Sequence, residues 1–290
     1  MKATSTMNRG RLMLLSSMVI FGTIGIFVRH IQLPSSLIAQ IRGLSGCVFL
    51  LLVLLAQRKK LDGTAIRKNL PVLVLSGIFL GGNWIALFEA YRYTTVATAT
   101  LCYYMAPILV MLLSPILLGE RLTVRKVLII IVALNGMNFV TGVHKSWPQE
   151  EQLMGIALGL LAAALYASVI IANRKLKDIG TYDTTIMQLG VSAVVLLPYN
   201  LLTVDFGALQ WDGAAIGLLA VVGIVHTGIA YWLYFGSLKK LPAQTAALMS
   251  YIDPITAIVL SALVLGEQMT LTGIIGAVLV LGATAVDLKE

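Results

Sequence analysis

Charged residues are scarce in this chain of 290 residues, at 12% against the roughly 25% that is typical of soluble domains. Hydrophobic residues make up 58% of the chain, and its mean hydropathy is +0.91. This composition argues against an ordinary soluble domain. It predicts a protein whose solvent is a lipid bilayer.

Chemically reactive residues are also few. The two cysteines, Cys47 and Cys102, both fall in apolar stretches, which argues against a disulfide scaffold. The three histidines lie on different segments, and no HExxH, Walker A, paired CxxC or GxSxG motif is present. We therefore expect no enzyme, no metal and no cofactor. No ATP-binding module is present either.

Apolar runs of about 20 residues recur from end to end, and each suits a bilayer core about 30 Å thick. No stretch is left for a separate soluble domain, and the first run is expected to be an uncleaved helix rather than a signal peptide. The ten predicted spans are 12–30, 36–56, 70–91, 96–118, 124–142, 153–173, 183–203, 213–237, 242–265 and 270–287.

The basic residues predict the orientation of these spans. With the N-terminus in the cytoplasm, 17 of the 21 Lys and Arg fall in cytoplasmic segments, as the positive-inside rule requires. We expect a multi-pass protein of the cell (inner) membrane with both termini cytoplasmic. The net charge of +8 is spread over short loops, so nucleic acid is not an expected partner.

The chain also contains an internal repeat. Residues 98–123 align with residues 245–270 at a constant offset of 147, and 12 of the 26 positions are identical. The matches include Pro107 with Pro254 and one Leu-Gly-Glu triplet with another. A duplicated membrane segment is the signature of a transporter built from two related halves.

Each half holds five spans, and an odd number makes the second half enter the membrane from the opposite side. The sequence therefore predicts an all-α integral membrane protein, with ten transmembrane helices as two five-helix inverted repeats. The predicted first repeat is 1–142, the polar linker is 143–152 and the second repeat is 153–290. Such proteins bind substrate near the membrane midplane between the halves.

The two Leu-Gly-Glu triplets (118–120 and 265–267) each follow a proline twelve positions before the glycine. With the segments 90–100 (AYRYTTVATAT) and 237–247 (SLKKLPAQTAA), they resemble the EamA-type domains of the drug/metabolite transporter (DMT) superfamily. The resemblance covers essentially the whole chain. It implies a ten-helix inner-membrane carrier, commonly an exporter of amino acids or other small metabolites. It also implies a cavity lined mainly by helices 1, 3, 4, 6, 8 and 9.

Residues shared by both repeats are expected to build the scaffold, so polar residues found in one repeat only are the candidates for substrate or ion chemistry. In the shared triplets, Gly allows a tight approach or turn at a helix end, and Glu caps the next helix or pairs with a basic residue of a loop. Asp253 is the sharpest one-sided residue, near the middle of the ninth span and opposite Ala106. A carboxylate there costs about 2.5–3.5 kcal/mol on insertion scales. It either carries a proton, cation or substrate amine, or bonds the backbone freed by Pro254.

Three further one-sided residues have two interpretations each. His226 forms a proton relay with Asp253 or packs between helices. Arg42 holds a substrate carboxylate or extends to the headgroups. Glu89 carries a proton or cation, or pairs with Arg92 at the interface.

Aromatic and amide residues complete the candidates, as a cage for the substrate or as core packing. The predicted substrate-binding residues are Asn83, Trp84, Tyr104, His226, Tyr231, Asp253 and Arg42, and the predicted coupling residues are Asp253, His226 and Glu89.

The leading prediction is a secondary active exporter of amino acids or related small metabolites that works by alternating access. Proton coupling fits the lone carboxylates, but the sequence does not establish it. The alternatives are an exporter of lipophilic cations or drugs, and a membrane sensor or scaffold that transports nothing. The expected partners are a small-molecule substrate and the lipid bilayer, and two complete halves suit a monomer.

Overall fold

The computed structural model describes residues 2–119, 123–142, 148–209, 211–238, 240–241, 245–246 and 249–287, with side chains from residue 8 onward except 284 and 287. All regular secondary structure in these ranges is helical. Three predicted features lie at least partly outside them: Glu120, residues 143–147 of the linker, and most of the ninth span before residue 249.

The predicted ten-helix membrane fold is confirmed. Eight described segments are long and apolar enough to cross a membrane, and two shorter apolar helices match the last two predicted spans. Large aliphatic side chains are exposed along these segments, as expected of a surface that faces lipid. The uninterrupted helices are α1 (Lys2–Arg29), α2 (Ser35–Ala56), α3 (Gly63–Tyr93), α6 (Val124–Thr141), α7 (Glu150–Asn173), α8 (Thr181–Thr203), α12 (Ile252–Leu265) and α13 (Leu271–Asp287).

Two spans are composite. The fourth contains α4 (Val96–Tyr103) and α5 (Ala106–Leu117), and the eighth contains α9 (Gly213–Ala220), the π-helix η1 (Val221–Ile229) and α10 (Ala230–Leu238). A π-helical stretch inside an α-helix is rare and frequently marks a functional site.

Side-chain caps determine where several helices begin. The Asp62 carboxylate accepts hydrogen bonds from the Thr64 and Ala65 amides, so α3 begins before the apolar run that predicted its span. Thr95 caps α4 and Thr123 caps α6 in the same way. α3 is therefore longer than the hydrophobic segment from which its span was predicted, whereas α4 and α6 begin where the sequence predicted.

The fourth and ninth spans are interrupted at repeat-equivalent positions. The chain turns at Tyr104 and Met105 between α4 and α5, and at Ser250 and Tyr251 before α12. A proline follows each turn and has no N–H to bond the carbonyl four residues earlier, which weakens the helix at that point. Proline alone does not force a break, since Pro71 and Pro198 lie inside the continuous helices α3 and α8. At both places the helix is fully interrupted.

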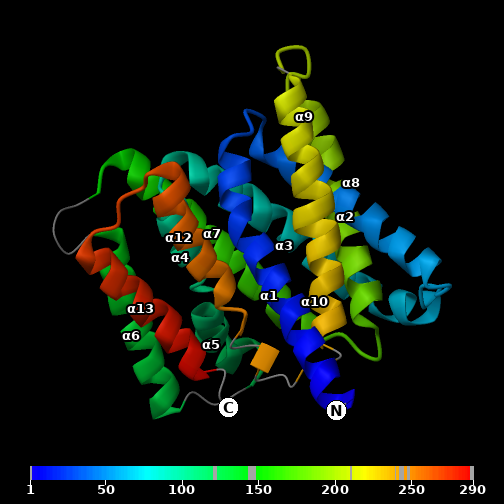
Figure 1. Ribbon diagram of the computed structural model, residues 1–290, viewed down its shortest axis with the longest axis horizontal. Helices are drawn as coiled ribbons and strands as arrows, with labels where there is room; N and C mark the ends of the chain where they lie inside the picture. Colours follow the sequence, from blue (N-terminus) through cyan, green and yellow to red (C-terminus); the bar gives the residue numbers. More distant parts are fainter. Residues whose placement is uncertain are drawn as a thin grey trace.

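The two repeats pack mainly against each other. In the first repeat, α1 packs on α10 and α12, while α3 packs on α7 and α8. At one edge of the bundle, α6 lies beside α13 (Figure 1). The first turns of α1 and the last turns of α13 lie at the same end of the bundle (Figure 1).

Glycine allows the close approach of α6 and α13. A Cβ atom added at Gly276 would lie 2.5 Å from the Gly136 carbonyl oxygen and 2.8 Å from the Val140 nitrogen. Both neighbours are backbone atoms, which cannot rotate away as a side chain can. The contact is thus the small-residue type by which membrane helices associate.

We predict that Gly276→Ala separates α6 from α13 and lowers the thermal unfolding midpoint of the purified protein in detergent. Overpacking of this kind costs about 1–3 kcal/mol. Gly282→Ala on the same helix is the control, because its Cβ would meet open space. Alanine favours a helix over glycine by about 1 kcal/mol, so this control is expected to keep or raise the midpoint. Equal midpoints for the two variants would contradict the prediction.

Candidate functional site

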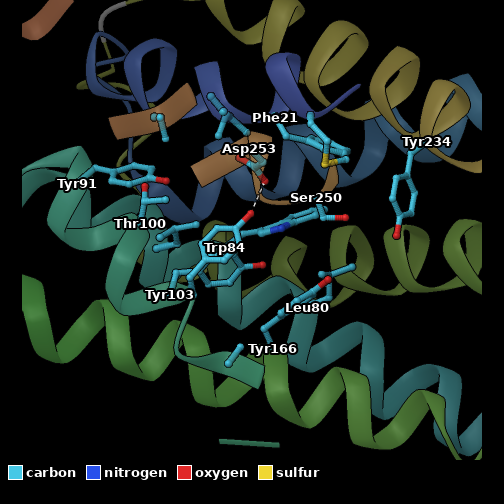
Figure 2. A pocket seen from close by; sticks show the side chains of 18 of the residues that line it. Phe21, Leu80, Trp84, Tyr91, Thr100, Tyr103, Tyr166, Tyr234, Ser250 and Asp253 are labelled. Carbon is cyan, nitrogen blue, oxygen red and sulfur yellow. Dashed lines mark hydrogen bonds between the residues drawn. The ribbon is translucent and has the colours of Figure 1, made fainter. Parts of the chain in front are cut away.

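A cavity of about 280 Å³ lies between α1, α3, α4, α7, α10 and α12 (Figure 2). Among the described residues that line it, Asp253 and Arg42 are the only charged ones. Its walls are otherwise mostly aliphatic and aromatic, and they include six of the ten tyrosines of the chain: Tyr91, Tyr103, Tyr104, Tyr166, Tyr231 and Tyr234.

Asp253 connects the two broken spans. It lies in the first turn of α12 and points into the cavity (Figure 2), where its Oδ2 accepts a hydrogen bond of 2.7 Å from the Tyr104 hydroxyl. Tyr104 belongs to the break between α4 and α5, so the bond joins the break of one repeat to that of the other. Gly22 lets α1 approach the backbone of Asp253 closely, because a Cβ at this position would lie 2.5 Å from the Asp253 carbonyl oxygen.

Arg42 enters the cavity from α2. Its Nε donates a 2.9 Å hydrogen bond to Thr227 Oγ1, and its guanidinium carbon lies 4.2 Å from the centre of the Trp84 ring. The Thr227 hydroxyl itself donates to the Val222 carbonyl, five residues earlier, which is the spacing of the π-helix η1. The π-helix therefore places Thr227 where it holds the guanidinium.

The aromatic side chains of the wall support one another. Tyr231 meets Phe21 edge to face at 5.3 Å and stacks on Phe235 at 5.7 Å, measured between ring centres. The Tyr103 ring meets the Tyr104 ring edge to face at 5.7 Å and lies tilted against the Tyr166 ring at 5.4 Å, again measured between ring centres. Such mutual contacts restrict ring rotation and keep the cavity shape.

Five of the predicted site residues thus meet in one cavity: Arg42, Trp84, Tyr104, Tyr231 and Asp253. The resemblance implied a cavity lined mainly by helices 1, 3, 4, 6, 8 and 9. Arg42 adds helix 2 to that set.

Asn83 and His226 lie outside the described cavity lining. The Asn83 Nδ2 donates a 2.7 Å hydrogen bond to the Ala162 carbonyl, which joins α3 to α7. The His226 Nε2 lies 2.8 Å from Thr23 Oγ1, and its Nδ1 lies 3.3 Å from the Val221 carbonyl oxygen. Both ring nitrogens therefore have partners other than Asp253.

Glu89 lies apart from the central cavity, at the end of the bundle that holds the α1–α2 connection. It accepts a 2.5 Å hydrogen bond from the Ser35 hydroxyl, and the Arg92 Nε is 3.8 Å from its carboxylate. Arg92 in turn donates to the Leu33 carbonyl. This is the geometry of the i,i+3 pair expected at a membrane interface.

The sequence interpretation missed Tyr166, Thr100 and Ser250, which also line the cavity. A signal existed for Tyr166, because it is the only aromatic residue in the otherwise aliphatic α7. Ser250 lines the cavity from the break before α12. Because it lies in a turn, the periodicity of a helix gave no signal for it.

A second polar cluster joins three spans at the same end of the bundle as Glu89. The Glu267 carboxylate accepts hydrogen bonds from Ser261 Oγ at 2.6 Å and from the Val96 amide at 2.9 Å, and its Oε1 lies 2.8 Å from Arg29 Nη1. Arg29 also donates to the Thr94 carbonyl at 3.0 Å. We call this set of contacts the Glu267 clamp.

The Glu267 clamp explains one Leu-Gly-Glu triplet. Gly266 ends α12 in the left-handed region, at a φ of +65°, where glycine carries no steric cost. Glu267 then reaches the N-terminus of α4, where a negative charge is favourable. The sequence predicted a cap on the next helix or a pair with a basic loop residue. The structure differs: Glu267 caps α4 of the other repeat and pairs with Arg29, the last residue of α1.

Comparison with known proteins now places the chain. The model of the EamA-like transporter family matches residues 8–142 and again residues 153–286. The chain belongs to the EamA-like transporter family. Its ten-segment fold and internal duplication are those of a transporter from this family.

Similar proteins agree with this assignment. An "Uncharacterized transporter YxxF" of Bacillus subtilis (strain 168) is 33% identical over 94% of this chain and 87% of its own length. Protein RarD of Salmonella typhi is 27% identical over 69% of this chain and 66% of its own length. A solved crystal structure shares the fold with a TM-score of 0.64 at 20% identity, and the match covers 96% of each chain.

We predict that Tyr104→Phe destabilises this EamA-like transporter, because it removes the only hydrogen bond that a described residue donates to the Asp253 side chain. A lost hydrogen bond to a charged group costs about 1.5–3 kcal/mol. The thermal unfolding midpoint in detergent is expected to fall, whereas Tyr199→Phe, at an exposed tyrosine of α8, leaves it unchanged. Equal midpoints for both variants would show that the bond contributes nothing.

Proposed function

We propose that the protein is a secondary carrier that exports amino acids or related small metabolites across the cell (inner) membrane. The observation that carries this proposal is the cavity at the two helix breaks, where Asp253 and Tyr104 join the repeats. Transporter substrate sites are commonly built from discontinuous helices at a repeat interface. A cavity of about 280 Å³ is slightly smaller than the roughly 300–1,000 Å³ of ordinary ligand pockets, which favours a small metabolite over a bulky drug.

The orientation forms part of the proposal. The first repeat (1–142) and the second repeat (153–290) enter the membrane from opposite sides, and both termini are cytoplasmic. The distribution of Lys and Arg supports this arrangement. The first turns of α1 and the last turns of α13 lie at the same end of the bundle, which also supports this arrangement (Figure 1). The Glu267 clamp then lies at the outer side.

Alternating access requires the Glu267 clamp to form and break. The clamp holds the outer ends of α1, α4 and α12 together, and these helices also line the central cavity. Closing the outer ends while the inner ends separate gives the substrate access from the cytoplasm. Opening the clamp releases the substrate outward.

Proton coupling is assigned to Asp253. A carboxylate in a membrane cavity is costly to keep charged without a partner, so it exchanges readily between a proton and a cationic substrate group. Neither His226, whose ring nitrogens have other partners, nor Glu89, which is at the interface, is needed for this exchange.

The test is efflux from proteoliposomes loaded with a mixture of amino acids and other metabolites, read by mass spectrometry, with and without an acidic exterior. We expect selective loss that the acidic exterior accelerates and that Asp253→Asn abolishes. Asp178→Asn is the matched control, because Asp178 is exposed and pairs only with Lys68 among the described residues. Selective loss at the same rate with and without the acidic exterior would contradict proton coupling. No selective loss from folded protein would contradict the metabolite carrier and favour an exporter of lipophilic cations, which the lone carboxylate and aromatic walls would suit.

The Glu267 clamp makes a separate prediction. Glu267→Gln weakens the ion pair and is expected to increase the outward-open population. A cysteine introduced at Thr100, which lines the cavity, would then react several-fold faster with a membrane-impermeant thiol reagent added outside. Cys47 and Cys102 are replaced by Ala in every sample. Glu151→Gln, at an exposed glutamate of α7, serves as the control. An unchanged labelling rate in Glu267→Gln would remove the clamp from the transport cycle.

A further inference from the structure

The cavity holds one positive and one negative side chain, which attract each other across it without direct contact. Arg42 and Asp253 both line it, and neither takes part in an ion pair with any residue that the structure describes. A buried charge without a partner is unfavourable, and in a membrane it is rarely retained without a function.

The guanidinium of Arg42 is held in a way that leaves its fork available. Thr227 accepts the hydrogen bond from Nε, and the guanidinium carbon lies over the Trp84 ring. No described residue accepts a hydrogen bond from Nη1 or Nη2. Two parallel N–H donors in a fixed plane match the two oxygens of a carboxylate, a match that lysine cannot reproduce.

Asp253 is the opposite pole. Tyr104 donates to Oδ2, and no described side chain or amide donates to Oδ1. A carboxylate with one oxygen occupied still accepts a hydrogen bond from an ammonium group at the other. The hydrogen bond from Tyr104 therefore orients the carboxylate without neutralising it.

Between these two poles the wall carries no charge. Leu80, Leu87 and Ile24 supply aliphatic surface, and the tyrosines supply aromatic surface with hydroxyl groups. A substrate side chain that lies there gains from burial if it is uncharged, whereas a charged one would lose its hydration without a partner.

We infer that the substrate is a small zwitterion with an uncharged side chain, recognised at both poles: its carboxylate binds the Arg42 fork and its ammonium binds Asp253. This inference rests on the proposed function and narrows its substrate class to neutral amino acids. Arg42 and Asp253 are the specificity-determining residues. Thr227 and Trp84 are positioning residues that act through Arg42.

The test measures binding to the full-length protein in detergent by isothermal titration calorimetry. The probes are leucine, isoamylamine, which lacks the carboxylate, and isocaproate, which lacks the ammonium group; methionine and phenylalanine with their corresponding amines and acids form parallel series. In at least one series the amino acid is expected to bind about tenfold or more tighter than either analogue, because each analogue leaves one buried charge unpaired.

The variants separate the two poles. Arg42→Gln is expected to weaken the amino acid about tenfold or more while the amine binds at least as tightly as before, because the charge that it left unpaired is gone. For the same reason, Asp253→Asn is expected to weaken the amino acid while the acid binds at least as tightly as before. Retained binding of one analogue also shows that the variant is folded. Arg42→Lys keeps the charge without the fork and is expected to restore only part of the affinity. Thr227→Val is expected to weaken the amino acid and not the amine, and Lys68→Gln, at an exposed lysine, is the control.

Two results would overturn the inference. One is an amine that binds the unchanged protein as tightly as its amino acid, together with an Arg42→Gln variant that binds both normally. The other is the absence of amino-acid binding in all three series while singly charged metabolites leave the loaded proteoliposomes. In both cases selective efflux would still support the carrier, so failure of two-pole recognition is distinguishable from failure of the proposed function.

Discussion

A membrane-spanning helix must satisfy its backbone hydrogen bonds internally, because lipid offers no partners. Pro107 and Pro254 break that rule at equivalent places in the two repeats, and the rest of the structure depends on how the breaks are accommodated. Both are enclosed by other helices, where tyrosine, serine and aspartate side chains can lie beside the interrupted backbone. The cavity lies beside these two breaks, which face protein rather than lipid.

Charged side chains have different partners at the centre of the bundle and at its end. In the Glu267 clamp, carboxylate, guanidinium and backbone amide compensate one another within the protein. In the cavity, Arg42 and Asp253 are held by neutral hydrogen-bonding partners instead. The first arrangement is complete by itself, as a structural contact should be. The second leaves both charges available to a ligand, which is why the recognition argument rests on it.

Sequence reasoning reached the fold because apolar length and a gapless repeat are properties of the chain itself. It found Asp253 and Arg42 by comparing repeats, since a charge in one half alone cannot be scaffold shared by both. Sequence reasoning said less about the direction in which a side chain points around its helix axis. Asn83 and Trp84 are neighbours at the same depth, yet consecutive helical residues point about 100° apart. Trp84 therefore lines the cavity while Asn83 bonds α7. Periodicity cannot supply that angle where a helix is apolar on every face.

The interlocking of the repeats has a consequence for biosynthesis. The partners of buried polar groups in the first half are made later: Asn83 bonds the Ala162 carbonyl, and Arg42 bonds Thr227. When only the first five spans have been inserted, the Asn83 amide and the Arg42 guanidinium are in the bilayer without these hydrogen-bond partners. The nascent half-chain must be sheltered by the insertion machinery, by headgroups or by water until α7 and η1 emerge. The polar contacts of the first half are therefore completed only when the second half is in the membrane.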